Sequence, residues 1–148
     1  GQRFLFPRGL AGLGWGLPLA LGAKQAAPDK PVIAIVGDGG FAHAWSELET
    51  ALRMRLPVTV VVLNNQRLGY ERDYESISFG AYSDACDLAP VDHAAIARAC
   101  GCDGVRVEAA ADVGSALDRA LTNSRATVLD VMVDPSAYPP ITGFDGKL

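Results

Sequence analysis

The sequence has no long apolar run and no cluster of basic residues. None of its apolar stretches approaches the roughly 20 residues of a membrane span, and its lysines and arginines are scattered rather than grouped. Residues 1–30 also lack the charged, apolar and small-residue succession of a signal peptide. A formal net charge of −4 disfavours binding to a phosphate backbone. We therefore expect no membrane partner, no nucleic-acid partner and a cytoplasmic location.

Cysteine is scarce as well. The three cysteines, Cys86, Cys100 and Cys102, are an odd number in a compartment that we expect to be reducing, which argues against a disulfide framework. With His93 they suggest a zinc site, but the Cys-Gly-Cys spacing is not that of a zinc knuckle. We interpret the cysteines as small buried apolar side chains.

The sequence is rich instead in short apolar runs. Residues 32–36 (VIAIV) and 58–63 (VTVVVL) are continuous and β-branched, which is typical of strands covered on both faces. Between them, Trp45, Leu48 and Leu52 recur at helical spacing. This order predicts a strand, a helix and a second strand.

The same alternation continues along the chain. Asp92 is placed to cap a helix that ends at Cys100, and Asp112 to cap a second helix with Val113, Leu117, Ala120 and Leu121 on one face. Residues 105–107 and 127–133 read as further strands, and residues 74–90 and those from Pro135 onward as loops. The pattern predicts an α/β fold, an open and mostly parallel sheet with helices on both faces, in a single domain over residues 1–148.

Polar residues follow the first two predicted strands at the point where each strand ends. Gly37, Asp38, Gly39 and Gly40 come after the first, and Asn64-Asn65 closes the second. Carboxyl ends of parallel strands share one edge of a sheet, and neighbouring strands lie about 4.8 Å apart. Asp38 and Asn65 could then share one Mg²⁺, while the glycines let a diphosphate approach the backbone. Two unrelated turns are the alternative, but they do not explain the pairing.

This pattern resembles thiamin-diphosphate-dependent enzymes. Gly-Asp-Gly at 37–39 and Asn64-Asn65, separated by residues 40–63, match the signature of their diphosphate-binding domain. The resemblance implies thiamin diphosphate and Mg²⁺ as cofactors, with Mg²⁺ held by Asp38, by the Asn65 side chain and by the main-chain carbonyl of Arg67. It extends over residues 4–134.

The segment GLAGLGWGLPLALGA, residues 9–23, resembles the acetohydroxyacid synthase and benzoylformate decarboxylase group. The resemblance implies that Ala11, Gly12 and Leu13 contact the cofactor, with Leu13 as the apolar wedge that bends it. One alternative places Leu13 in the core, on a helix over residues 13–26. Another takes Gly9, Gly12 and Gly14, after a strand-like FLF, as a nicotinamide-dinucleotide loop, which leaves the two asparagines unexplained.

The segment after the asparagines is expected to face the reacting carbon of the cofactor. Gln66, Leu68 and Gly69 look like the acetohydroxyacid synthase type, whereas Tyr70 and Tyr74 depart from it. We expect Leu68, Gly69 and Tyr70 to contact the cofactor. Glu71 lies at the spacing of a catalytic glutamate of pyruvate decarboxylase, and its alternative is a solvated loop acid paired with Arg67 or Arg72. His43 is expected in the core or at a helix start.

The resemblance also implies a reaction and partners. The reaction is decarboxylation of a 2-oxo acid, carboligation, or both, in a homo-oligomer of two or four copies. Relatives need a separate pyrimidine-binding domain that carries an activating glutamate, so we expect the chain alone to be inactive. We expect it to be the C-terminal part of a longer enzyme or one subunit of a split enzyme. A non-catalytic diphosphate-binding assembly subunit is the alternative from another class.

Overall fold

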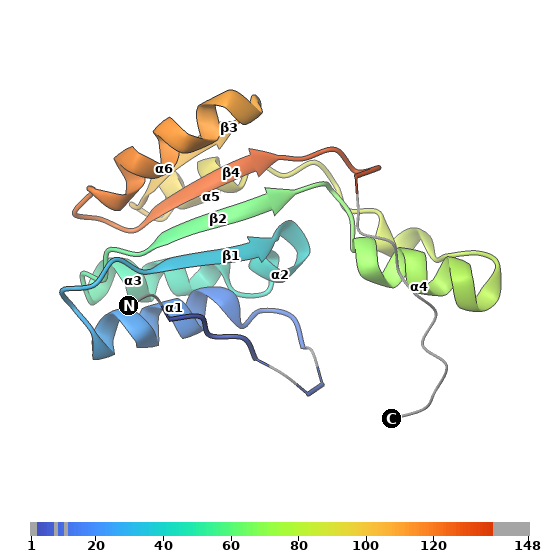
Figure 1. Cartoon of the computed structure of the whole chain (residues 1–148), viewed down its shortest axis with the longest axis horizontal. Coiled ribbons are helices and arrows are strands. Elements are labelled where there is room, and N and C mark those ends of the chain that lie inside the picture. Colours follow the sequence, from blue (N-terminus) through green and yellow to red (C-terminus); the bar gives the residue numbers. More distant parts are fainter. Residues whose placement is uncertain (1–2, 8, 11, 138–148) are drawn as a thin grey trace.

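A four-stranded parallel sheet organises the chain. The computed structural model describes residues 3–7, 9–10 and 12–137. The strands lie side by side in the order β1-β2-β4-β3, and each pairs with its neighbour in parallel (Figure 1). Their bounds are Ile33–Gly37 for β1, Thr59–Asn64 for β2, Asp103–Val107 for β3 and Thr127–Met132 for β4. The predicted parallel α/β sheet is confirmed.

Helices cover both faces of this sheet. One face packs against α1 (Gly16–Ala26), α3 (Leu48–Arg53) and α5 (His93–Ala99), whose side chains form one apolar core with Val58, Val60 and Val62 of the β2 region. The other face packs against α6 (Val113–Leu121) in a smaller core around Leu129. Figure 1 shows α6 on one side of the sheet and α1 with α3 on the other. No helix in the described ranges is long and apolar enough to cross a membrane.

The local predictions for the helix caps, the helix faces and the cysteines are confirmed only in part. The Asp92 side chain accepts a hydrogen bond from the Ala95 amide, 2.7 Å long, and caps α5. The predicted burial of the cysteines is confirmed for Cys86 and Cys102 and is wrong for Cys100, which is half-buried; all three are free. Asp112 makes no side-chain cap, because it already has helical backbone angles at the end of the 3-10 turn η3 (Ala110–Asp112). Leu121 is 37% exposed, since α6 turns Ala116 and Ala120 rather than this leucine toward the sheet.

The edge strand β1 is covered on one face only. Ala34 is buried beneath α1, but Ile33 and Ile35 on the other face are 43% and 70% exposed. The smaller core under α6 draws on β2, β3 and β4 and includes no residue of β1. The prediction of strands buried on both faces therefore holds for most of β2 and is wrong for β1.

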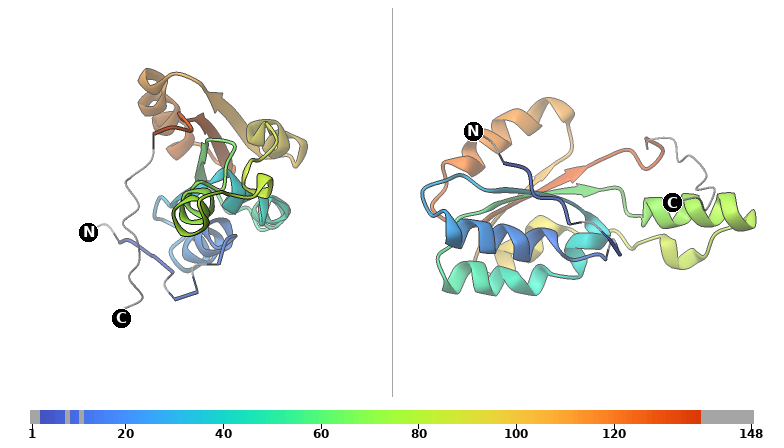
Figure 2. Two further views of the ribbon diagram at one scale, coloured as in Figure 1. Left: turned by 90° about the vertical axis from the view of Figure 1, so that its right-hand side faces the viewer. Right: turned by 60° about the horizontal axis from the view of Figure 1, so that its bottom comes forward.

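The stretch predicted as a loop over residues 74–90 begins as a helix. α4 runs from Gly69 to Phe79 and ends at Gly80, whose φ of 73° is the left-handed conformation that glycine adopts readily. A 3-10 turn, η2 (Asp84–Cys86), follows. α4 projects from the body of the domain beyond the carboxyl ends of the strands (Figures 1 and 2). None of the residues of α4 is buried, so the helix has no apolar face against the domain that the sequence could display.

The region between β1 and β2 is helical in three pieces rather than one. α2 (Asp38–Ala42) follows β1 directly, and the 3-10 turn η1 (Trp45–Glu47) leads into α3. On the exposed face of α3, Arg53 Nε lies 2.9 Å from Glu49 Oε1. These short helices leave Asp38 as the first helical residue after β1, at the carboxyl edge of the sheet.

Candidate functional site

The carboxyl ends of β1 and β2 bring the two predicted metal ligands to one edge. Gly37 of β1 lies opposite Leu63 of β2, so Asp38 and Asn65 follow adjacent strands. The backbone amide of Gln66 donates a 2.7 Å hydrogen bond to Asp38 Oδ2. The turn after β2 therefore lies directly against the start of α2, as the predicted pairing requires.

The turn that follows Asn65 has an unusual backbone. Gln66 has a φ of 59°, a left-handed conformation that costs a residue with a side chain on the order of 1 kcal/mol or more. Asn65 Oδ1 accepts a 3.1 Å hydrogen bond from the Arg67 amide. The Arg67 guanidinium is occupied elsewhere, 3.6 Å from Asp87 Oδ1 and 3.3 Å from the Pro135 carbonyl. No group within the described residues donates a hydrogen bond to the Arg67 main-chain oxygen.

Asp38 is a buried carboxyl group. The residue is only 4% exposed, and no described side chain forms an ion pair with it. Burial raises the pKa of Asp38, although the backbone amides of Gly39 and Gln66 and the nearby His93 work in the opposite direction. An unpaired buried carboxylate is unfavourable, and a bound cation would relieve that cost.

The donor set fits a hard cation. Mg²⁺ prefers oxygen ligands, and Asp38, the Asn65 side chain and the Arg67 main chain supply a carboxylate, an amide and a carbonyl oxygen. Among the described residues no three His, Cys, Asp or Glu side chains gather in a group that could hold a metal. A metal here would therefore need the asparagine and the backbone as ligands, and phosphate oxygens and water would have to supply the rest.

The glycines around Asp38 serve different purposes. A Cβ on Gly39 would collide with Leu68, so this glycine lets the start of α4 pack against α2. A Cβ on Gly37 or Gly40 would meet no described heavy atom within 4 Å. The backbone at these two positions is open, and a diphosphate can approach it closely.

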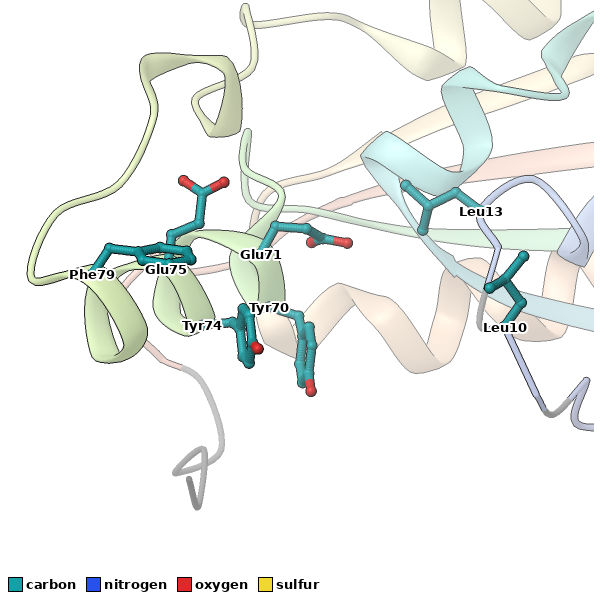
Figure 3. Close-up of a pocket in the computed structure, with 7 residues that line it drawn as sticks. All are labelled: Leu10, Leu13, Tyr70, Glu71, Tyr74, Glu75 and Phe79. Atoms are coloured by element: carbon teal, nitrogen blue, oxygen red, sulfur yellow. The ribbon is translucent and has the colours of Figure 1, made fainter. Parts of the chain in front are cut away.

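A pocket of about 610 Å³ lies between α4 and the loop that precedes α1 (Figure 3). Leu13 lines it from the loop, 45% exposed and outside α1, so its alternative interpretation as a core leucine is wrong. Gly12 is exposed beside it, whereas Ala11 lies outside the described residues. Among the described residues the lining comprises Leu10, Leu13, Tyr70, Glu71, Tyr74, Glu75 and Phe79.

The α4 side of the pocket is aromatic and acidic. The rings of Tyr70 and Tyr74 stack, with centroids 6.4 Å apart and planes 7° apart. The Glu71 carboxylate extends from α4 toward Leu13 (Figure 3). The expected ion-pair alternative for Glu71 is wrong, because Arg67 and Arg72 both pair with Asp87.

Sequence reasoning missed several residues here and misplaced one. Glu75 and Phe79 also line the pocket, and they lie four and eight positions after Glu71, so a predicted α4 would have revealed both. Leu10 was missed as a pocket residue. His43 is exposed at the C-terminal end of α2, neither in the core nor at a helix start.

The dinucleotide alternative fails on local structure. It requires a strand, a glycine loop and then a helix, but residues 3–7 form no strand in the structure. Gly9 and Gly14 have φ values of 105° and 95°, and they shape the loop before α1. This loop instead places Leu13 opposite α4.

Comparison with known proteins identifies the family. The family model described as "Thiamine pyrophosphate enzyme, C-terminal TPP binding domain" matches residues 1–131. The chain belongs to this family. The thiamin-diphosphate resemblance of the Gly37–Asn65 region is thereby confirmed.

Similar proteins and a solved structure agree with this family assignment. YdaP of Bacillus subtilis, named as a thiamine pyrophosphate-containing protein, is 39% identical over 96% of the chain and 24% of its own length. The large subunit of acetolactate synthase isozyme 3 of Escherichia coli is 36% identical over 93% of the chain and 25% of its length. The thiamine diphosphate-dependent 4-hydroxybenzoylformate decarboxylase of Rhodococcus jostii superposes with a TM-score of 0.75, at 32% identity, over 82% of this chain and 23% of that one. The chain spans about a quarter of the curated relatives' length.

Proposed function

We propose that this domain holds the diphosphate and Mg²⁺ of thiamin diphosphate in an enzyme that decarboxylates a 2-oxo acid, joins the product to an acceptor carbonyl, or does both. The observation that carries the proposal is the buried Asp38, which has no ion-pair partner among the described residues and lies against the Asn65–Arg67 turn, in a chain of this family. Thiamin diphosphate, when bound, supplies the electron sink that such a decarboxylation needs. The protein supplies binding, orientation and protons.

Each part of the site has a proposed task. Asp38, Asn65 Oδ1 and the Arg67 carbonyl hold Mg²⁺, and the open backbone at Gly37 and Gly40 accepts the diphosphate. Gly39 permits the close approach of Leu68, which begins the turn into α4. Leu68, Gly69 and Tyr70, together with Ala11, Gly12 and Leu13, complete the proposed cofactor contacts.

The pocket is the proposed site for the substrate side chain. Its aromatic pair, Tyr70 and Tyr74, and the leucines opposite offer an apolar wall. We assign Glu71 the task of holding or moving a proton at the reacting carbon, and its place in the pocket lining supports this. Because one structural relative is a 4-hydroxybenzoylformate decarboxylase, aromatic 2-oxo acids belong beside pyruvate among the candidate substrates.

We further propose that the domain needs a pyrimidine-binding domain with an activating glutamate, in the same polypeptide or in a partner, and works as a cytoplasmic homo-oligomer. The chain spans about a quarter of its relatives' length, which leaves room for such domains in them. Leu10, Leu13 and Trp15 also expose apolar surface that a neighbouring domain would cover. By itself the chain is then inactive.

The test is an assay of the assembled enzyme, this chain together with its pyrimidine-binding domain, against aliphatic and aromatic 2-oxo acids with thiamin diphosphate and Mg²⁺. We expect Glu71→Gln to lower kcat by roughly 10²-fold or more, with cofactor affinity almost unchanged. Asp73→Asn is the matched control, because it removes a carboxylate from the same helix outside the pocket lining. Unchanged turnover in Glu71→Gln removes this residue from the mechanism. Absence of all turnover, with cofactor still bound, favours the non-catalytic assembly subunit.

A further inference from the structure

A buried carboxylate behind the metal site has no assigned role. Asp130 lies in the middle of β4 and is 0% exposed. It accepts hydrogen bonds from Asn64 Nδ2 at 2.9 Å, from the backbone amide of His93 at 3.1 Å and from Arg106 Nη1 at 3.4 Å. These three donors come from β2, from the start of α5 and from β3. Asp130 therefore joins three separate segments at one point under the carboxyl edge of the sheet.

Two of these contacts fix one end of the segment formed by residues 86–93. Asn64 donates to Asp130 and also to the carbonyl of Val91, 3.1 Å away. The amide of His93 bonds directly to Asp130. The chain at Val91 and His93 is thus held on β2 and β4.

The other end of residues 86–93 holds the turn that carries the metal ligands. The Leu88 amide donates to the Gln66 carbonyl and the Leu68 amide donates to the Cys86 carbonyl, both at 2.8 Å. These bonds flank Arg67, which pairs with Asp87 across the same bridge. The turn is held between β2 and residues 86–93.

The same segment also supports α2. The ring of His93 packs edge-on against Phe41, with centroids 5.4 Å apart and planes 79° apart. It also lies 5.9 Å from the ring of Trp45. Phe41 belongs to α2, the short helix that begins with Asp38. Residues 86–93 therefore contact both α2 and the Asn65–Arg67 turn, the two parts of the proposed metal site.

We propose that Asp130 is a positioning residue for the metal and diphosphate site: by fixing residues 86–93 through Asn64 and the His93 amide, it holds the Asn65–Arg67 turn against Asp38. Because Asp130 is 0% exposed, we assign it no direct contact with cofactor or substrate. The left-handed Gln66 needs such support, because an unconstrained turn would relax to a more favourable backbone conformation. The proposal rests on the proposed metal role of Asp38 and Asn65 and adds the element that keeps their geometry.

The experiment is calorimetric titration of Mg²⁺ into the assembled enzyme at saturating thiamin diphosphate, for the wild type and for Asp130→Asn. An amide at position 130 turns one acceptor into a donor that faces Asn64 or His93, so the segment loosens. We expect Mg²⁺ affinity to fall 10- to 100-fold, the usual effect of removing a group that orients metal ligands. In metal-free protein, hydrogen exchange of the amides of Gln66, Leu68 and Leu88 is expected to rise at least tenfold, with α3 unaffected.

Asp103→Asn is the matched control. Asp103 also accepts bonds from an asparagine and an arginine, Asn123 at 2.6 Å and Arg125 at 2.7 Å, but at the amino end of β3. The Asp103→Asn substitution should lower the stability of the protein without changing its Mg²⁺ affinity. If Asp130→Asn does not fold, Asn64→Ser disrupts the same network more gently and should show the same loss in smaller measure.

The outcomes separate this proposal from the one before it. A folded Asp130→Asn or Asn64→Ser enzyme with wild-type Mg²⁺ affinity and wild-type exchange would overturn the positioning role alone. An equal loss of affinity in Asp103→Asn would also overturn it, because the effect would then be general destabilisation. Mg²⁺ binding that survives Asp38→Asn would instead contradict the proposed function.

Discussion

Replacing Asp38 with asparagine should separate the stability of the free protein from its stabilisation by cofactor. In the free protein, burial raises the pKa of Asp38 above its unfolded value of 3.8. The ionised form is therefore disfavoured on folding, and the resulting loss of stability is complete above the folded pKa and absent below 3.8. At neutral pH a neutral amide removes this loss, and its oxygen can still accept the 2.7 Å bond from Gln66. We expect Asp38→Asn to be at least as stable as the wild type without ligands.

The stabilisation of the protein by bound cofactor should be lost in Asp38→Asn. A ligand at 100 times its dissociation constant stabilises the folded state by about 2.7 kcal/mol. In a protein whose Tm moves roughly 2–4 °C per kcal/mol, that is a rise on the order of 5–10 °C. Asp38→Asn removes the only carboxylate of the proposed ligand set, so the rise should vanish.

Scanning calorimetry of the assembled enzyme with and without thiamin diphosphate and Mg²⁺ measures both quantities at once. Asp103→Asn is again the control, because it loses an ion pair with Arg125 at the other edge of the sheet. Its Tm should fall without ligands, while its ligand-dependent rise stays intact. A full ligand-dependent rise in Asp38→Asn would refute the metal assignment, and a lower ligand-free Tm in that variant would refute the argument from its buried charge.

Further predictions concern packing and thiols. Gly104→Ala should lower the free energy of unfolding by about 1–3 kcal/mol or more, since a Cβ there would collide with the backbone of Ala94. Gly114→Ala, in open space on α6, should not lower stability. Chemical denaturation compares the two variants. Equal stability of both variants would contradict the tight contact of β3 with α5. A thiol reagent at pH 8 should modify Cys100 before Cys102, because burial raises the pKa of the Cys102 thiol, whose labelling should quicken as pH rises. Mass spectrometry showing Cys102 modified first would contradict this burial.

The sheet and the meeting of Asp38 with the turn after Asn65 could be predicted because they follow from local patterns. The β-branched runs at 32–36 and 58–63 predict parallel strands, and the rule that such strands end at one edge brings Asp38 and Asn65 together. The contact of Gln66 with Asp38 then confirms that the two segments meet. Nothing beyond residue type, order and spacing was needed for this part.

Other features depend on contacts that the sequence does not display. α4 buries no residue, so its sequence carries no apolar stripe against the domain, and the pattern predicts a loop from residue 74 onward. The exposure of Ile35 follows from where α6 lies across the sheet rather than from the strand itself. The bond between Asn64 and Asp130 joins residues 66 positions apart. In the sequence, the only sign of this contact is that Asp130 is a single acid inside the apolar run 127–133.

The most direct test of the central claim is calorimetric comparison of thiamin diphosphate with thiamin monophosphate, each titrated into the assembled enzyme with Mg²⁺ and with a chelator. The account predicts that the diphosphate binds tightly only when Mg²⁺ is present, because Asp38, Asn65 and the Arg67 carbonyl hold the phosphates through the metal. The monophosphate should bind at least about 100-fold more weakly, a loss of about 2.7 kcal/mol. Binding of the two compounds with equal affinity, or binding of the diphosphate undiminished by the chelator, would contradict it.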